Sequence, residues 1–127
     1  MFDYQKPDPE PSPFTTIAWR LNHLAGLNDL YYEYLFGPGK RNWHDQDVPS
    51  DLTETAGEWR KWLIRIREEL LECDSEDLDR QVGMPWEWEP EARTVEEWAS
   101  ILVAENIHHG AEIGVLRDLY RATVPND

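Results

Sequence analysis

The stretch WASILVAENIHHGAEIGVLRDL, residues 98–119, decides the fold of this chain. Within it, residues of one row recur at alternating steps of four and three, the spacing of side chains stacked on one helical face. The row consists of Trp98, Leu102, Glu105, His109, Glu112, Leu116 and Leu119. Its apolar ends predict a helix that packs inside a bundle. The acidic and imidazole groups in its middle are costly to bury unless each of them has a partner.

Two more long helices are predicted upstream, over residues 13–36 and 51–74. The first carries two adjacent apolar rows, and an arc that wide must be covered from more than one side. Residues 75–93 form a long connection to the last helix, and no segment shows convincing β-alternation. Residues that suit helix starts precede all three helices: Ser12 before Pro13, Asp51 with Glu54, and Thr94 with Glu97. The pattern predicts an all-α, up-down helical bundle with three long helices.

The chain has 127 residues, which is the size of a single domain. Residues 1–13 contain four prolines, which exclude a helix and indicate an extended N-terminal arm. We expect the bundle domain to occupy residues 14–127. Seven tryptophans and five tyrosines are a heavy aromatic load for this length, so the sequence predicts a bulky core or an aromatic-lined pocket.

The formal net charge of −14 restricts the partners of the chain, because nucleic acid and anionic membrane surfaces repel it. No apolar run approaches the roughly 20 residues of a membrane span, and no signal peptide is visible. The single cysteine, Cys73, excludes an intrachain disulfide and suits a reducing cytosol. We therefore expect a cytoplasmic protein that binds a small-molecule substrate and neither nucleic acid nor membrane.

Glu105 and His109 lie one helical turn apart on the same face, and ligands at that spacing can share one metal ion. His23 sits in an apolar row of the first predicted helix, so it also points into the bundle, where sites are built from facing helices. Two histidines and one carboxylate can bind a divalent metal and leave positions open for water or substrate. The alternative is that His23 and Glu105 form a hydrogen-bonded pair without metal.

Two neighbours of this set are candidate catalytic residues. Glu112 lies almost one turn beyond His109, where it can act as a further ligand, as an acceptor that orients the His109 ring, or as a base. His108 is rotated by about 100° from His109 around the helix, which puts it at the flank of the site or at its mouth.

At these residues the chain resembles the DinB/YfiT-like superfamily of helical bundles, and its actinobacterial members in particular. The likeness is carried by TTIAWRLNHL, residues 15–24, and by ENIHHGAEIG, residues 105–114, with LRDLY behind it. The resemblance implies three histidine ligands for a divalent metal (zinc, nickel, iron or manganese) in a four-helix bundle. Carried over to this chain, His23 is the first ligand and His109 the last, while Glu105 replaces the middle histidine.

The family bundle also has a helix before its first histidine helix, whereas only the proline-rich residues 1–13 precede it here. The resemblance therefore implies a shortened variant, or replacement of that helix by the loop around Trp86 and Trp88 or by a partner subunit. The wide apolar arc of the first predicted helix also predicts self-association into a homo-oligomer, since large exposed apolar patches mark interfaces.

Characterised relatives include thiol-dependent S-transferases and isomerases that use mycothiol or bacillithiol. The resemblance thus implies a metalloenzyme, either a thiol-dependent S-transferase or a related metal-assisted transferase or hydrolase, with a low-molecular-weight thiol as co-substrate. The alternative is a non-catalytic, oligomeric helical binding module in which the buried histidine and glutamate residues pair without metal.

Overall fold

The computed structural model describes residues 16–46, 49 and 51–124, and the predicted arm over residues 1–13 lies outside them. Three long helices dominate: α1 (Ile17–Phe36), α2 (Leu52–Glu72) and α4 (Val95–Thr123). The shorter elements are the 3₁₀ helix η1 (Trp43–Asp45), α3 (Ser75–Asp79), β1 (Gln81–Val82) and β2 (Arg93–Thr94). The prediction of an all-α bundle with three long helices is confirmed. No helix in this part of the chain is both long and apolar enough to cross a membrane.

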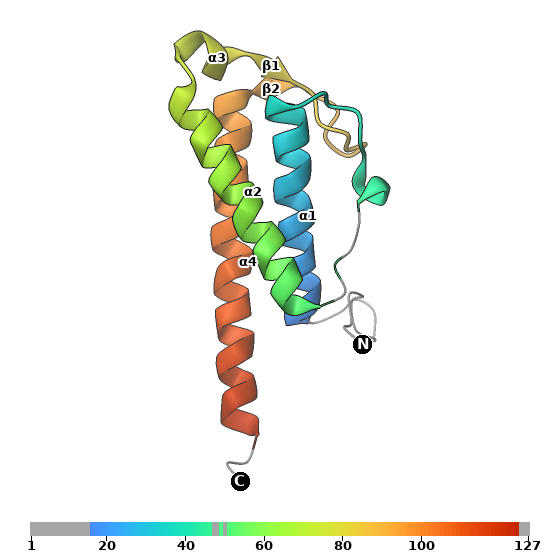
Figure 1. Ribbon diagram of the computed structural model, residues 1–127, viewed down its shortest axis with the longest axis vertical. Helices are drawn as coiled ribbons and strands as arrows, with labels where there is room; N and C mark the ends of the chain where they lie inside the picture. Colours follow the sequence, from blue (N-terminus) through green and yellow to red (C-terminus); the bar gives the residue numbers. More distant parts are fainter. Residues whose placement is uncertain (1–15, 47–48, 50, 125–127) are drawn as a thin grey trace.

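The directions of the helices differ from the predicted up-down order. α1 and α2 run the same way and α4 runs against both (Figure 1). Tyr32, late in α1, accordingly hydrogen-bonds to Glu69, late in α2 (3.4 Å), whereas Arg20, early in α1, pairs with Glu112, late in α4. The up-down order is therefore wrong for the first two helices. The reason is that residues 37–46 lead the chain back along the outside of α1 instead of turning directly into α2.

Capping side chains start α2 and α4 where the sequence predicted. Asp51 caps α2, and Thr94 and Glu97 form a reciprocal capping box at the start of α4. The start of α1 differs, because Thr16 is its N-cap and the helix begins at Ile17. The cap predicted four residues earlier lies outside the described residues.

The connection between α2 and α4 contains structure that the sequence did not predict. α3 has its own capping box, and β1 pairs with β2 in an antiparallel register that sets Val82 opposite Arg93. Strands of two residues are too short to show the alternation that reveals a strand. The intervening loop folds onto the bundle, where Trp86 is buried and the Trp98 indole N–H donates to the carbonyl oxygen of Val82 (2.7 Å). Trp88, in contrast, is exposed.

The core lies between α1, α4 and this loop, and α2 adds Ile66 to it. Its fully buried apolar side chains are Leu24, Leu30, Leu35, Val95 and Trp98. The row predicted on α4 is buried only in its first half. Leu119, at the far end of that row, is exposed because α4 continues past the beginning of α1 (Figure 1).

A polar cluster lies where the three long helices meet. The amide of Asn106 in α4 donates to Asn28 Oδ1 (2.9 Å), and the amide of Asn28, fully buried in α1, donates back to Asn106 Oδ1 (3.3 Å). The indole N–H of Trp59 in α2 donates to the same Asn106 oxygen (2.8 Å). Because buried polar groups stabilise a fold only when they are paired, this cluster ties the three helices to one mutual register.

We expect Asn106→Leu to lower the free energy of unfolding by about 2 kcal/mol, because it leaves the buried amide of Asn28 without this partner and removes the acceptor of the Trp59 indole. Asn28→Leu should cost less, because Asn106 keeps its bonds to Trp59 and to the carbonyl oxygen of Leu102. The double variant should cost less than the sum of the two single costs, because both partners are removed together. Urea unfolding followed by circular dichroism measures all four free energies. If the losses in free energy of unfolding were strictly additive, they would contradict a direct coupling between the two amides.

Candidate metal centre

Two helices bring the three predicted ligands together. His23 projects from α1, and Glu105 and His109 project from consecutive turns of α4. A carboxylate oxygen of Glu105 lies 3.2 Å from His109 Nε2 and 4.0 Å from His23 Nε2. One donor atom from each of the three residues lies within 4.8 Å of the other two, and all three residues are half-buried. The antiparallel packing of α1 on α4 thus creates one three-donor cluster.

Aromatic rings surround the two imidazoles and restrict their rotation. The ring of His23 stacks on Trp19, with centroids 5.0 Å apart and planes within 6° of parallel. Trp43, from η1, contacts the His23 ring with a centroid distance of 5.5 Å. His109 meets His23 edge-on, with centroids 4.9 Å apart and planes at 74°. The packing therefore holds the ring nitrogens near the carboxylate of Glu105.

The two ring nitrogens of His109 face different groups. Nε2 faces Glu105, whereas Nδ1 lies 3.6 Å from the Glu112 carboxylate and 3.4 Å from the Arg20 guanidinium. Burial lowers the pKa of His109, although the negative charge of Glu105 opposes this shift. The ring is consequently neutral near pH 7, which is the form that binds metal ions.

His108, His109 and Glu112 form a second cluster of potential ligands. Glu112 is already ion-paired with both Arg20 and His108. The side chain of His108 is 65% exposed, and its ring stacks on that of His109 with centroids 4.7 Å apart. The positive charge of Arg20 opposes a second cation there, so the cluster around Glu105 is the better metal centre. The two candidate catalytic residues lie on the Nδ1 side of His109.

The donor set of His23, Glu105 and His109 fits a divalent metal ion. Ligands of one tetrahedral zinc ion lie about 3.4 Å from each other, because each is about 2.0–2.2 Å from the metal. The observed separations of 3.2 Å and 4.0 Å lie on either side of that value, and the donors of His23 and His109 lie within 4.8 Å of each other, so the cluster is close to the spacing that one ion needs. Imidazole nitrogens and a carboxylate oxygen also suit nickel, iron and manganese.

A cavity of about 590 Å³ opens beside this cluster, with His23 and Glu105 in its wall. The other lining residues come from α1, from α4 and from two connections: Trp19, Asn22, Leu27, Tyr31, Trp43, His44, Trp86, Trp88, Glu89 and Ile101. Both connections, η1 with its flanking residues and the loop between β1 and β2, lie on the same side of α1 (Figure 1). The tryptophans and tyrosines are thus divided between the core and a pocket.

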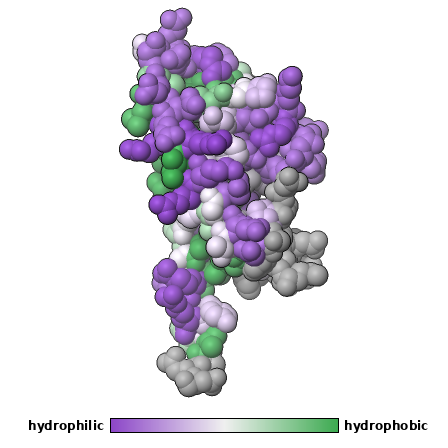
Figure 2. Space-filling model, in the orientation of Figure 1, coloured by the Kyte–Doolittle hydropathy of each residue, from purple (hydrophilic) through white to green (hydrophobic). Residues whose placement is uncertain are grey.

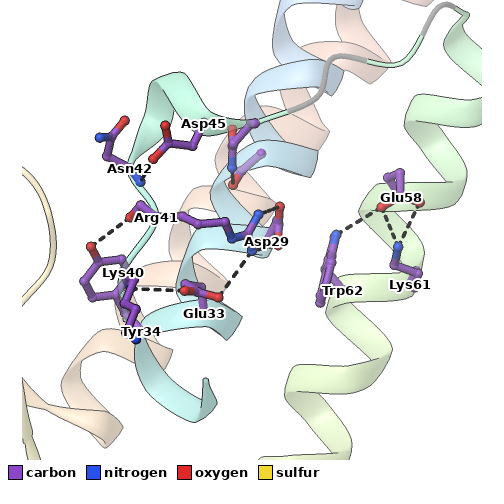
Figure 3. A network of polar contacts seen from close by, with 12 residues as sticks. Asp29, Glu33, Tyr34, Lys40, Arg41, Asn42, Asp45, Glu58, Lys61 and Trp62 are labelled. Carbon is purple, nitrogen blue, oxygen red and sulfur yellow. Dashed lines mark hydrogen bonds and ion pairs between the residues drawn. The ribbon is translucent and has the colours of Figure 1, made fainter. Parts of the chain in front are cut away.

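An ion-pair network holds the connection after α1 in place (Figure 3). Arg41 donates two hydrogen bonds to Asp29 (2.7 and 3.0 Å) and a third to Glu33 (3.4 Å). The backbone N–H of Lys40 also donates to Glu33 (3.1 Å), and this bond lowers the pKa of that carboxyl. The hydroxyl of Tyr34 donates to the Arg41 carbonyl oxygen (2.8 Å). The network fixes the backbone just before η1, which carries Trp43 of the pocket wall.

We expect Arg41→Ala to lower the free energy of unfolding by about 2 kcal/mol. It removes the cation from the carboxylates of Asp29 and Glu33, whose side chains are only 15% and 10% exposed. The matched control is Lys61→Ala, which breaks the exposed Glu58–Lys61 pair on α2 (Figure 3) and should cost about 0.5 kcal/mol or less. Urea unfolding compares the two variants, and equal costs would refute an anchoring role for Arg41.

A family model for the DinB superfamily matches residues 4–113. This span covers most of the chain, and the chain therefore belongs to the DinB superfamily, as its two histidine-bearing helices predicted. Comparisons with curated proteins and with solved structures found no match.

Proposed function

We propose that this chain is a divalent-metal-dependent member of the DinB superfamily, with His23, Glu105 and His109 as the metal ligands. The observation that carries the proposal is the convergence of these three donors beside a 590 Å³ cavity, whose wall includes His23 and Glu105. Three protein ligands beside a cavity leave coordination positions that substrate can reach, which is the pattern of catalytic rather than structural sites.

A bound divalent metal supplies a Lewis acid that lowers the pKa of a thiol or of water toward neutrality. In this proposal the carboxylate of Glu112, 3.6 Å from Nδ1 of His109, holds the ring so that Nε2 faces the ligand position. Arg20 holds Glu112 by an ion pair, so Glu112 acts as a positioning residue. His108, which pairs with Glu112 and is exposed, provides a route for proton exchange with solvent.

The reaction we propose is the transfer of a low-molecular-weight thiol to an electrophilic small molecule. The sulfur forms a bond to an electrophilic carbon, the thiol proton is released, and the leaving group departs with its bonding electrons. Family membership and the donor set support metal dependence, whereas the thiol rests on the resemblance to S-transferases. A thiol co-substrate and a single cysteine suit a reducing compartment, so the proposal includes a cytoplasmic location.

The substitutions His23→Ala and His108→Ala distinguish between the two candidate metal clusters, because each removes a residue of only one cluster. We expect protein without a histidine tag to bind one zinc ion per chain, and His23→Ala to lose this binding because it removes a ligand. His108→Ala should retain it. Calorimetric titration with zinc measures both results. The opposite pattern would move the centre to the cluster around Glu112, and unchanged binding by both variants would reject both assignments.

Circular dichroism is the control for this experiment. The helical signal should persist in both variants, because the core is built from long amphipathic helices rather than around the ion. Loss of the helical signal on His23→Ala would make the cluster a structural element and would remove the main support for an enzyme.

The alternative is a non-catalytic, oligomeric helical module, and one observation favours it. Exposed apolar or small side chains follow each other at every fourth position of α4: Val103, Ile107, Ala111, Val115 and Leu119. Figure 2 shows hydrophobic side chains at the surface of the protruding end of α4. This row carries no charge, so two copies of a chain with a net charge of −14 can meet there with less repulsion. Self-association is compatible with both functions.

We expect light scattering at micromolar concentration to return at least the mass of a dimer. Ile107→Glu, in the middle of the row, should shift the population toward the monomer, because it buries a charge in the contact. Ile64→Glu, which changes an exposed isoleucine of α2, is the matched control and should leave the mass unchanged. A monomer mass for the unsubstituted protein would contradict self-association.

A further inference from the structure

The wall of the cavity beside the metal centre is mainly aromatic. Trp19 and Tyr31 reach it from α1, Trp43 reaches it from η1, and Trp86 and Trp88 reach it from the loop between β1 and β2. A volume of about 590 Å³ is typical of pockets that enclose a small organic molecule. Tryptophan faces offer such a molecule large, rigid contact surfaces on which a flat ring can stack.

The two tryptophans of the loop between β1 and β2 differ in exposure. Trp86 is 8% exposed and Trp88 is 82% exposed, yet their rings stack with centroids 5.8 Å apart and planes within 9° of parallel. The buried indole thus supports an exposed one, which remains in contact with water although water is a poor solvent for it. A ligand that covered Trp88 would remove that apolar surface from water.

The charged groups that line the cavity disfavour an anion. Glu89 and Glu105 contribute carboxylates, and among the described lining residues there is no lysine or arginine. Arg93 is paired with Glu89 (2.6 Å), so these two charges compensate each other at the edge of the pocket and the carboxylate of Glu105 remains. The histidines of the lining, His23 and His44, do not supply a permanent positive charge.

We propose that this pocket binds a planar aromatic substrate without negative charge, which stacks on the indoles of Trp43 and Trp88. This inference rests on the proposed function, in which that molecule is the electrophile presented to the metal centre. Both tryptophans lie on connections held by separate anchors, the Arg41 network for one and the buried Trp86 for the other. The stacking surface is therefore formed before the ligand arrives.

Two probes of equal ring size test the substrate class on the metal-free protein, in which no bound cation attracts an anion: 2-naphthalenemethanol, which is neutral, and 2-naphthoate, which is anionic. We expect saturable binding of the alcohol in a calorimetric titration, with the affinity for the carboxylate at least about tenfold lower because it meets the carboxylate of Glu105. Equal or tighter binding of 2-naphthoate would overturn the exclusion of negative charge. If neither probe bound, the proposal that the pocket takes an aromatic substrate would be overturned.

Trp88→Ala is the variant that tests the position of the probe. It should lower the affinity for 2-naphthalenemethanol by about tenfold, because one stacking partner is lost. Trp88 is so exposed that its removal should not disturb folding. Trp62→Ala is the matched control, since Trp62 lies on α2 outside the cavity, and it should leave the affinity unchanged. If both substitutions lowered the affinity for the probe equally, the proposal that the probe stacks on Trp88 would be overturned.

His109→Ala separates this inference from the metal proposal, because His109 does not line the cavity. This variant should lose zinc and still bind 2-naphthalenemethanol, whereas Trp88→Ala should keep zinc and lose affinity for the probe. Zinc binding without probe binding in the unsubstituted protein would reject the aromatic substrate alone. Probe binding without zinc binding would reject the metal centre alone.

Discussion

The hydrogen-bonded amides of Asn28 and Asn106 set the register of α1 against α4, and the candidate site depends on that register. A step of one residue along a helix rotates a side chain by about 100°. Such a shift of α4 would turn Glu105 and His109 away from α1. Apolar contacts alone tolerate sliding better than an amide pair does, because a displaced amide loses its partner inside the core.

Local signals allowed the sequence to predict the long helices. The capping box of Thr94 and Glu97 and the cap at Asp51 depend on residues three positions apart, and both are confirmed. The parallel course of α1 and α2 was missed, because it depends on the route of a polar connection that has no periodic pattern. The pairing of β1 with β2 was missed for the same reason, since two-residue strands carry too little pattern to recognise.

The site was predictable to the extent that its residues share a helix. Glu105 and His109 are four positions apart, so their convergence follows from helical geometry alone. His23 needed the further assumption that its apolar row faces α4, and the structure brings its ring to that cluster. The sequence predicted an aromatic-lined pocket only as an alternative to a bulky core, and it did not indicate where the pocket lies, because tertiary contacts position Trp43 and Trp88. Asn28 was also missed, although a polar residue inside a wide apolar arc was a usable signal.

The pairing of α1 with α4 has a consequence for how the protein folds. The contacts at the centre join residues far apart in the chain, with separations of 78 for Asn28–Asn106 and 89 for Arg20–His109, whereas Tyr32 and Glu69 are separated by 37. Closing the longer loops costs more chain entropy, so the association of α1 with α2 is expected to precede the docking of α4. During synthesis on the ribosome, a chain that lacks α4 holds only one of the three proposed ligands. Under the proposed function, metal binding therefore comes at the end of folding.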